Sequence, residues 1–313
     1  MSPRAALAEA LLVTLATPAS WPLALGAFLL RGGLLLVVLP IIVLPSPVSL
    51  GNLLGPALTR VVLSGIPVEL AIAVGVFALA VVGWVVVGGL VAAVLEAEGA
   101  RLVAHHDDGA VFDGDGRDDG GRDDHVSGRM AMRVLAARLI THVPTGIALV
   151  WGSARLVNVA YRELTSPSDV VSPIVLRVLR EAPEVIVAVG ALWAFGEIVG
   201  GLAARRIVLT GDDVRRGLRA GTLAAIRRPL MALAGFWVPA AGLALVLLPS
   251  AVAASVAWAA VRVAMSSSAG PVGPTFAVML FVALWMVGLL LVAVTTAWRA
   301  AVWSIVERDH LMG

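Results

Sequence analysis

The chain has 313 residues, of which 59% are hydrophobic and 14% charged, and its formal net charge is +2. Its mean hydropathy of +0.95 leaves too little polar surface for a water-soluble protein, so the composition predicts a polytopic membrane protein. All 23 basic residues are arginine, a usage typical of a GC-rich prokaryotic genome, and the high isoelectric point does not indicate a nucleic-acid partner. Because cysteine is absent, disulfides, thiolate catalysis and Cys-ligated metals are excluded.

The N-terminal segment "MSPRAALAEALLVTLATPAS" has the basic start and apolar run of a signal peptide. Glu9 inside the run argues against cleavage. Residues 14–40 also resemble residues 222–249 when Phe28 is aligned with Phe236. Since a segment that recurs inside the chain is expected to be structural, we expect the N-terminus to be retained.

Six stretches are apolar over the roughly 20 residues that cross a bilayer as a helix. They cover residues 23–44, 67–95, 139–160, 183–203, 230–249 and 274–298. The third is the most polar, because side chains such as Thr141, Thr145 and Ser153 interrupt it. The sequence therefore predicts an all-α fold with six transmembrane helices.

The distribution of arginines between the connecting segments predicts the orientation. With a cytoplasmic N-terminus, sixteen arginines fall in cytoplasmic segments and six in segments on the other side. Positively charged segments stay preferentially in the cytoplasm. We therefore expect a multi-pass protein of a prokaryotic inner or plasma membrane with both termini in the cytoplasm.

The connections outside the cytoplasm show a second regularity. Arg60, Arg162 and Arg262 are 102 and 100 residues apart, and each precedes a break rich in Ser, Gly or Pro. This spacing predicts one membrane domain over residues 1–313, made of three helix-pair repeats with amphipathic interfacial helices. The repeats would cover about 10–98, 129–209 and 210–306, with an acidic loop at 99–128. Chance similarity among Ala, Leu, Val and Gly residues is the alternative.

The segment "RRIVLTGDDVRRGLRAGTLAAIRRPLMALAG", residues 205–235, joins two predicted spans. With the six-span plan, it resembles the linker in the membrane domain of glycerophosphodiester phosphodiesterases and of related six-helix bacterial membrane proteins of unknown function. No sequence for a soluble phosphodiesterase domain is present. The resemblance therefore implies the fold and not the activity.

The same linker predicts an amphipathic helix that begins at Asp212 or Asp213. Its polar side would carry Arg215, Arg216 and Arg219, with Arg227 and Arg228 following. Its apolar side would carry Val214, Leu218, Leu223 and Ile226. Such a helix is expected to lie on the inner leaflet and to meet anionic headgroups at about 1 kcal/mol per arginine. The alternative is a topology signal without lipid specificity.

The stretch "HHDDGAVFDGDGRDDGGRDDH", residues 105–125, is too polar to fold by itself. Arg117 and Asp118 stand where a calcium loop that begins at Asp113 needs a ligand and a glycine. His105, His106 and His125 could bind a divalent metal weakly, but a solvated cytoplasmic loop is the favoured interpretation. No metal site and no cofactor is predicted.

Ionisable residues inside the predicted spans are functional candidates, because an unpaired charge in the bilayer centre costs at least about 2.5 kcal/mol. Arg31 and Glu197 are the most deeply embedded. We consider the hypothesis that they form an ion pair, with Gly32 and Gly33 letting a neighbouring helix approach. The alternative places Arg31 at the membrane interface.

His142, Arg155 and Asn158 are the remaining polar candidates within the spans. No Ser/His/Asp set, HExxH motif or carboxylate pair stands at a usable spacing, so an enzyme is not expected. The sequence favours a non-catalytic scaffold or accessory subunit that contacts lipid, a protein partner or a second copy. The alternative is a small transporter or lipid-handling permease with a polar site around Arg31 and Glu197. Clustering of the five candidates around one cavity would favour transport, and dispersal would favour the scaffold.

Overall fold

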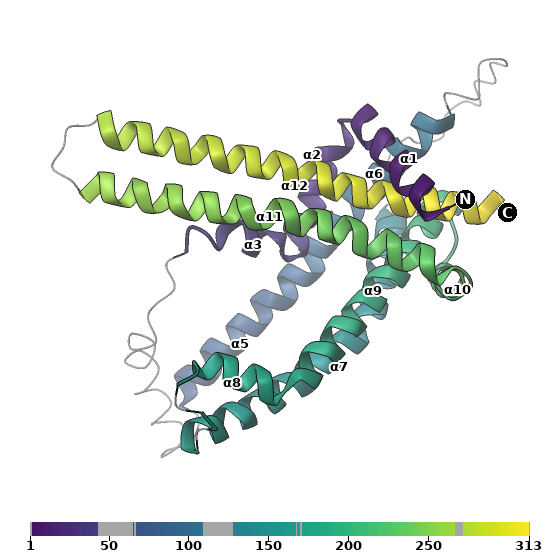
Figure 1. Cartoon of the computed structure of the whole chain (residues 1–313). Coiled ribbons are helices and arrows are strands. Elements are labelled where there is room, and N and C mark those ends of the chain that lie inside the picture. Colours follow the sequence, from purple (N-terminus) through teal and green to yellow (C-terminus); the bar gives the residue numbers. More distant parts are fainter. Residues whose placement is uncertain are drawn as a thin grey trace. The chain divides into compact units, whose positions relative to one another are not determined.

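The computed structural model describes residues 2–42, 65, 67–108, 128–166, 168, 169, 171–266 and 272–312. Within these ranges all regular secondary structure is helical (Figure 1). The helices are α1 (Pro3–Ala16), α2 (Ser20–Phe28), α3 (Leu34–Val38), α5 (Val68–Gly83), α6 (Gly89–Asp108), α7 (Gly128–Thr165), α8 (Ile174–Glu181), α9 (Pro183–Thr210), α10 (Val214–Arg227), α11 (Pro229–Ser266) and α12 (Val272–Met312). Two π-helical segments, Leu29–Gly33 and Trp84–Gly88, join α2 to α3 and α5 to α6.

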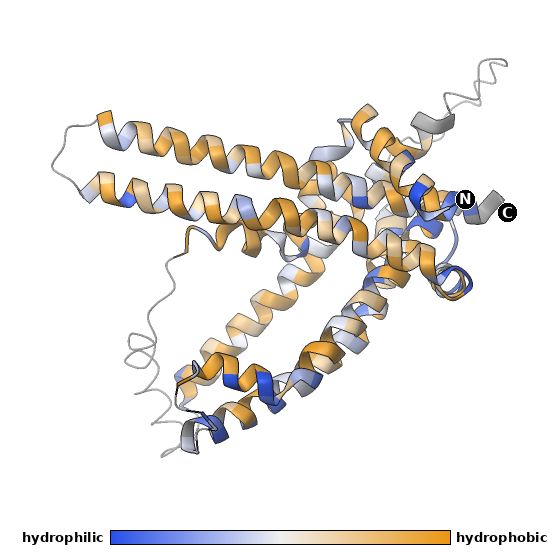
Figure 2. Cartoon of the chain, in the orientation of Figure 1, coloured by the Kyte–Doolittle hydropathy of each residue, from blue (hydrophilic) through white to orange (hydrophobic). Residues whose placement is uncertain are grey.

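In the described part of the chain, six helical stretches are long and apolar enough to cross a membrane. They are Ser20–Val38, Val68–Ala104, Gly128–Glu163, Pro183–Thr210, Pro229–Ser266 and Val272–Asp309. Figure 2 shows hydrophobic residues along most of α5, α11 and α12 and hydrophilic residues on α8 and α10. The chain is therefore an all-helical polytopic membrane protein, as the six apolar stretches predict. The repeats stay a prediction, and Arg60 lies outside the described residues.

The chain divides into two compact units. Unit 1 comprises Met1–Ser20, Ala97–Ala240 and Trp298–Gly313, and unit 2 comprises Trp21–Glu96 and Ala241–Ala297. Helices α6, α11 and α12 contribute residues to both units.

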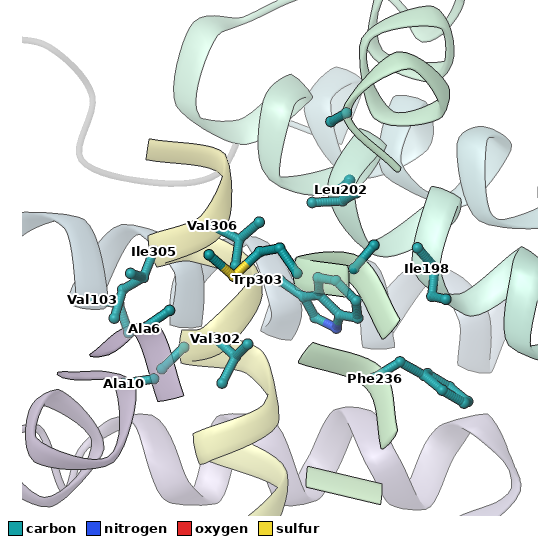
Figure 3. Packing of buried hydrophobic residues seen from close by; sticks show 14 of the residues in the cluster. Ala6, Ala10, Val103, Ile198, Leu202, Phe236, Val302, Trp303, Ile305 and Val306 are labelled. Carbon is teal, nitrogen blue, oxygen red and sulfur yellow. The ribbon is translucent and has the colours of Figure 1, made fainter. Parts of the chain in front are cut away.

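Helix α9 is the centre of unit 1, and small residues let its neighbours approach closely. A Cβ at Gly200 would lie 2.7 Å from Thr141 Oγ1 of α7, which lies side by side with α9 (Figure 1). A Cβ at Gly201 would lie 3.4 Å from the Trp303 ring of α12. Figure 3 shows Trp303 packed among residues that include Leu202 and Phe236. Close approach of backbones is the usual means of helix association in membranes.

Helix α1 belongs to the core of unit 1. Ala6, Ala10 and Val13 are buried in the same cluster as Trp303. Glu9, which interrupts the apolar N-terminal run, pairs with Arg308 of α12 at 2.5 Å.

Helix α10 folds back against α9 after a three-residue turn. Gly211 ends α9 in the left-handed conformation, with φ 74°, and the Asp213 side chain accepts a hydrogen bond from the Arg216 backbone N–H at 2.8 Å. A Cβ at Gly217 would lie 2.8 Å from Ile207 Cγ1, and one at Gly221 would lie 3.0 Å from the carbonyl oxygen of Val199. Later residues of α10 thus contact earlier residues of α9, which is the pattern of an antiparallel helical hairpin.

The first span of unit 2 is broken at Arg31 and Gly32. Gly32 has φ 105°, a value that other residues rarely adopt, and a Cβ there would meet nothing within 4 Å. The Trp84 Nε1–H donates to the carbonyl oxygen of Leu30 at 3.0 Å. Gly32 therefore permits a backbone break, and the close helix contact expected of it is not found.

The parts of α11 and α12 in unit 2 pack through aromatic and small residues. The ring centroids of Trp258 and Phe281 are 5.2 Å apart, and a Cβ at Gly288 would lie 3.1 Å from Ser250 Cβ. Leu36 and Val37 of α3, with Leu284 and Trp285 of α12, line an apolar cavity of about 20 Å³.

Helix α8 joins the ends of α7 and α9 and is amphipathic. Arg177 pairs with Glu163 at 3.2 Å, and both side chains are buried. Val175, Leu176 and Leu179 are exposed on another side of α8. This arrangement is typical of an interfacial helix, and α8 begins after Arg162, one of the three regularly spaced arginines.

Candidate functional site: the charged cluster at Glu197

The candidate site surrounds Glu197 of α9, whose side chain is 13% exposed. Glycines on either side of it bring α7 close: a Cβ at Gly196 would lie 2.8 Å from the carbonyl oxygen of Thr141, and Gly200 faces the same residue. The spacing of these glycines by four places both on one face of α9. As a result, charged side chains of α7 reach the carboxylate.

Two arginines meet Oε2 of Glu197 from different helices. Arg299 of α12 donates to it directly through Nη2, and Nη1 of Arg138 in α7 is 3.6 Å away. The Arg299 guanidinium also lies 6.0 Å from the centroid of the Phe236 ring. The carboxylate thus links α7, α9 and α12 through charge-assisted contacts.

His142 meets the other oxygen of the same carboxylate. Its Nε2 is 3.3 Å from Glu197 Oε1, and its Nδ1 is 2.8 Å from the carbonyl oxygen of Arg138. The Thr141 hydroxyl also donates to that carbonyl, at 3.0 Å. His142, whose side chain is 29% exposed, therefore belongs to the polar network around Glu197.

Four of the five sequence candidates lie in unit 1, and Arg31 lies in unit 2. His142 and Glu197 are together, whereas Arg31 pairs with Glu96 in unit 2. Arg155 pairs with the exposed Glu184 at 3.0 Å, and Asn158 is exposed.

Arg31 and Glu197 are each paired with another residue of their own unit, so these pairs give no support to the hypothesis of an Arg31–Glu197 pair, which stays a prediction. Glu96 is available to Arg31 because α6 continues past the end of its apolar stretch.

Three residues of these charge clusters were missed by the sequence reasoning. Glu96, Arg138 and Arg299 each lie one residue outside a predicted span, so they were assigned to connecting segments. One signal was present: Arg138 and His142 are four residues apart, which puts them on the same helix face if the helix begins earlier.

A second charged group lies beyond the Glu197 cluster in unit 1. Nε of Arg206 is 3.0 Å from Oδ2 of Asp212, and Nη1 of Arg206 is 3.4 Å from Oε1 of Glu307. The Glu307 side chain is fully buried. The hydrogen bond from Arg206 holds the pKa of Asp212 below its usual range. These pairs fix the turn between α9 and α10.

The arginines of α10 do not contact Glu197 in the described residues, and Arg228, directly after α10, pairs with Asp309 of α12. Gly217, Gly221 and Ala224 form its buried face, whereas the five predicted lipid-binding residues are exposed: Arg215, Arg216, Arg219, Arg227 and Arg228. Leu223 and Ile226 are 38% and 67% exposed, on the same side as the arginines. The expected apolar face is therefore not the buried one, because glycine and alanine let the α10 backbone approach α9 more closely than leucine would.

Metal ligation finds no support in the described residues, which contain no group of three His, Asp or Glu residues able to hold an ion. The stretch 109–127, with His125 and most of the acidic loop, lies outside the described residues, as do the side chains of His105 and His106.

Comparisons with models of protein families, with curated proteins and with solved structures give no significant match. The resemblance of residues 205–235 to the membrane domain of glycerophosphodiester phosphodiesterases therefore stays a prediction. The function has to be argued from the chemistry of the site and the exposed surfaces.

Proposed function

We propose that this membrane protein is a non-catalytic scaffold or accessory subunit that holds anionic lipid headgroups on the exposed face of α10. The observation that carries the proposal is the structure of α10 itself. Its glycine face is packed against α9, so its arginine face has a fixed direction. We further propose that this face belongs to the cytoplasmic leaflet of a prokaryotic cell membrane, in agreement with the distribution of arginines.

The position of α10 in the chain supports a lipid partner. It lies between α9 and α11, two helices long and apolar enough to span a membrane, and short connections join it to both. A helix between the ends of two spans lies near the membrane surface. Guanidinium groups match phosphate oxygens, and each is worth about 1 kcal/mol beside an anionic leaflet.

The composition of the exposed face supports the same partner. Arg215, Arg219 and Arg227 form no ion pair within the described part of the chain, so they are available to an anion. Leu223 and Ile226 lie between them and can enter the boundary between headgroups and acyl chains. A face that alternates arginine with large apolar residues suits a membrane surface better than bulk water.

The distribution of the polar candidates favours the scaffold over the transporter. Arg31 and Glu197 belong to different units, and each is in an ion pair with other residues. A transport site needs polar groups that converge on a substrate path. The separate pairs instead explain these residues as bonds between helices.

Lipid retention tests the proposal. The full chain would be purified in nanodiscs that contain phosphatidylglycerol and phosphatidylcholine, and tightly bound lipid would be counted by native mass spectrometry. We expect wild type to retain phosphatidylglycerol in preference, and the R215Q/R219Q/R227Q variant to lose most of that preference.

The matched control is R162Q/R180Q/R262Q, which removes the same charge from three exposed arginines elsewhere. It should retain phosphatidylglycerol as wild type does. Equal retention by the α10 variant and the control would reject the lipid-binding role and leave the arginines as a topology signal.

A further inference from the structure

We propose that His142 and Glu197 form a proton-binding site in unit 1, in which one proton is held between Nε2 of His142 and Oε1 of Glu197 and is released as the pH rises. The proposal is independent of the lipid contact on α10. It follows from the hydrogen-bond partners of the two imidazole nitrogens.

Nδ1 of His142 has a hydrogen-bond acceptor within its own helix. It lies 2.8 Å from the carbonyl oxygen of Arg138, and a carbonyl oxygen can only accept a hydrogen bond. The Thr141 hydroxyl is 3.3 Å from the same nitrogen, but it donates its hydrogen to that carbonyl, so it can only accept from Nδ1. Nδ1 therefore carries a hydrogen. In a neutral imidazole the other nitrogen, Nε2, is then an unprotonated acceptor.

Nε2 of His142 faces the Glu197 carboxylate. It lies 3.3 Å from Oε1 of Glu197, and an ionised carboxylate is also only an acceptor. Two lone pairs at this distance repel each other. The contact is favourable only when a proton lies between them, on either the imidazole or the carboxyl group.

Arg138 of α7 and Arg299 of α12 face Oε2 of Glu197, and Phe236 of α11 covers the Arg299 guanidinium. The two guanidinium groups keep the carboxylate ionised, so the proton resides on His142. The same groups repel the resulting imidazolium. The two guanidinium groups therefore act on the carboxylate and on the imidazolium in opposite directions.

Proton binding has a structural consequence for α7 and α9. With the proton, a charge-assisted hydrogen bond joins the two helices beside the contact of Gly196 and Gly200 with Thr141. Without it, the same position carries a repulsive contact. The tightness of the α7–α9 contact is therefore expected to follow the pH.

Nitrogen NMR of the histidine ring tests the site directly. The full chain, labelled with ¹⁵N-histidine and held in lipid nanodiscs, would be studied between about pH 5 and pH 8. The His142 signals are those lost in the His142→Asn variant. We expect both ring nitrogens to be protonated at low pH, and only Nδ1 at high pH.

The variant E197Q separates the proposal from a simple exposed histidine. The introduced amide can donate a hydrogen to Nε2, so no shared proton is needed and the helix contact is kept. We expect His142 to stay neutral, with Nδ1 protonated, over the whole range. The control E96Q changes a buried carboxylate paired with Arg31 and should leave the His142 titration unchanged.

Two results would overturn the proposal. One is a wild-type His142 whose Nε2 is unprotonated at every pH. The other is an E197Q variant whose His142 titrates as in wild type.

Discussion

Glu197 in unit 1 and Glu96 in unit 2 are both poorly exposed carboxylates, but they are held differently. Glu197 meets Arg138, His142 and Arg299 from two other helices, and its side chain is 13% exposed. Glu96 is more buried, at 6%, yet its partner Arg31 is 32% exposed. Burial of the carboxylate alone therefore does not tell which of the two contributes more to stability. The cost of losing a carboxylate also depends on whether its arginine partners remain buried or can reach solvent.

Replacing Glu197 with alanine should have the largest effect on stability. Arg138 and Arg299, with side chains 11% and 22% exposed, would be left facing each other without their shared carboxylate. Breaking a buried ion pair typically costs about 3–5 kcal/mol. We expect E197A to lower the free energy of unfolding by about 3 kcal/mol, measured by SDS titration in mixed micelles.

Glu96→Ala should cost less, about 2 kcal/mol, because Arg31 can turn toward solvent or headgroups. The exposed pair of Arg155 and Glu184 provides a control, and Glu184→Ala should change stability by less than about 1 kcal/mol. A loss for E96A equal to or above that for E197A would contradict the comparison.

Two glycine-to-alanine variants test whether helices are packed more tightly around Gly221 in unit 1 than around Gly75 in unit 2. Gly221→Ala in unit 1 would place a Cβ 2.9 Å from the backbone nitrogen of Ala203, and neither backbone can move aside cheaply. We expect a loss of about 1–3 kcal/mol in the free energy of unfolding. The matched variant Gly75→Ala, on α5 of unit 2, meets nothing within 4 Å.

The control variant should keep wild-type stability or gain up to about 1 kcal/mol, because alanine favours a helix over glycine. The same titration in mixed micelles measures both variants. Equal effects of the two would show that α10 is not packed tightly on α9.

The helical spans were predictable because hydropathy over about 20 residues is a strong signal, and each of the six predicted stretches overlaps one of the six long apolar helical stretches, although the first, 23–44, extends beyond Val38. Their ends were not predictable in the same way. Hydropathy falls where charges begin, but a helix continues as long as its backbone bonds and contacts persist. Glu96, Arg138 and Arg299 were missed for this reason.

The ion-pair partners of the charged residues could not be predicted from the sequence, for a different reason. Composition marks Arg31 and Glu197 as unusual, but which charges meet depends on which helices are neighbours and how each is rotated. Small residues such as Gly200 and Gly221 decide that here, and their individual partners cannot be read from a pattern. The N-cap of α10, by contrast, is a local signal: the sequence predicted Asp212 or Asp213, and the structure has Asp213.

A double-mutant cycle on Arg31 makes the smallest but most specific test. Arg31 and Glu96 should show a coupling energy of about 1 kcal/mol, because their pair is partly exposed. Arg31 and Glu197 should show none within error, since Glu197 is bound by Arg299. SDS titration of the single and double alanine variants gives both values. A coupling energy between Arg31 and Glu197, with none between Arg31 and Glu96, would show that Arg31 pairs with Glu197. The difference drawn here between the ion pairs of Glu197 and Glu96 would then be wrong.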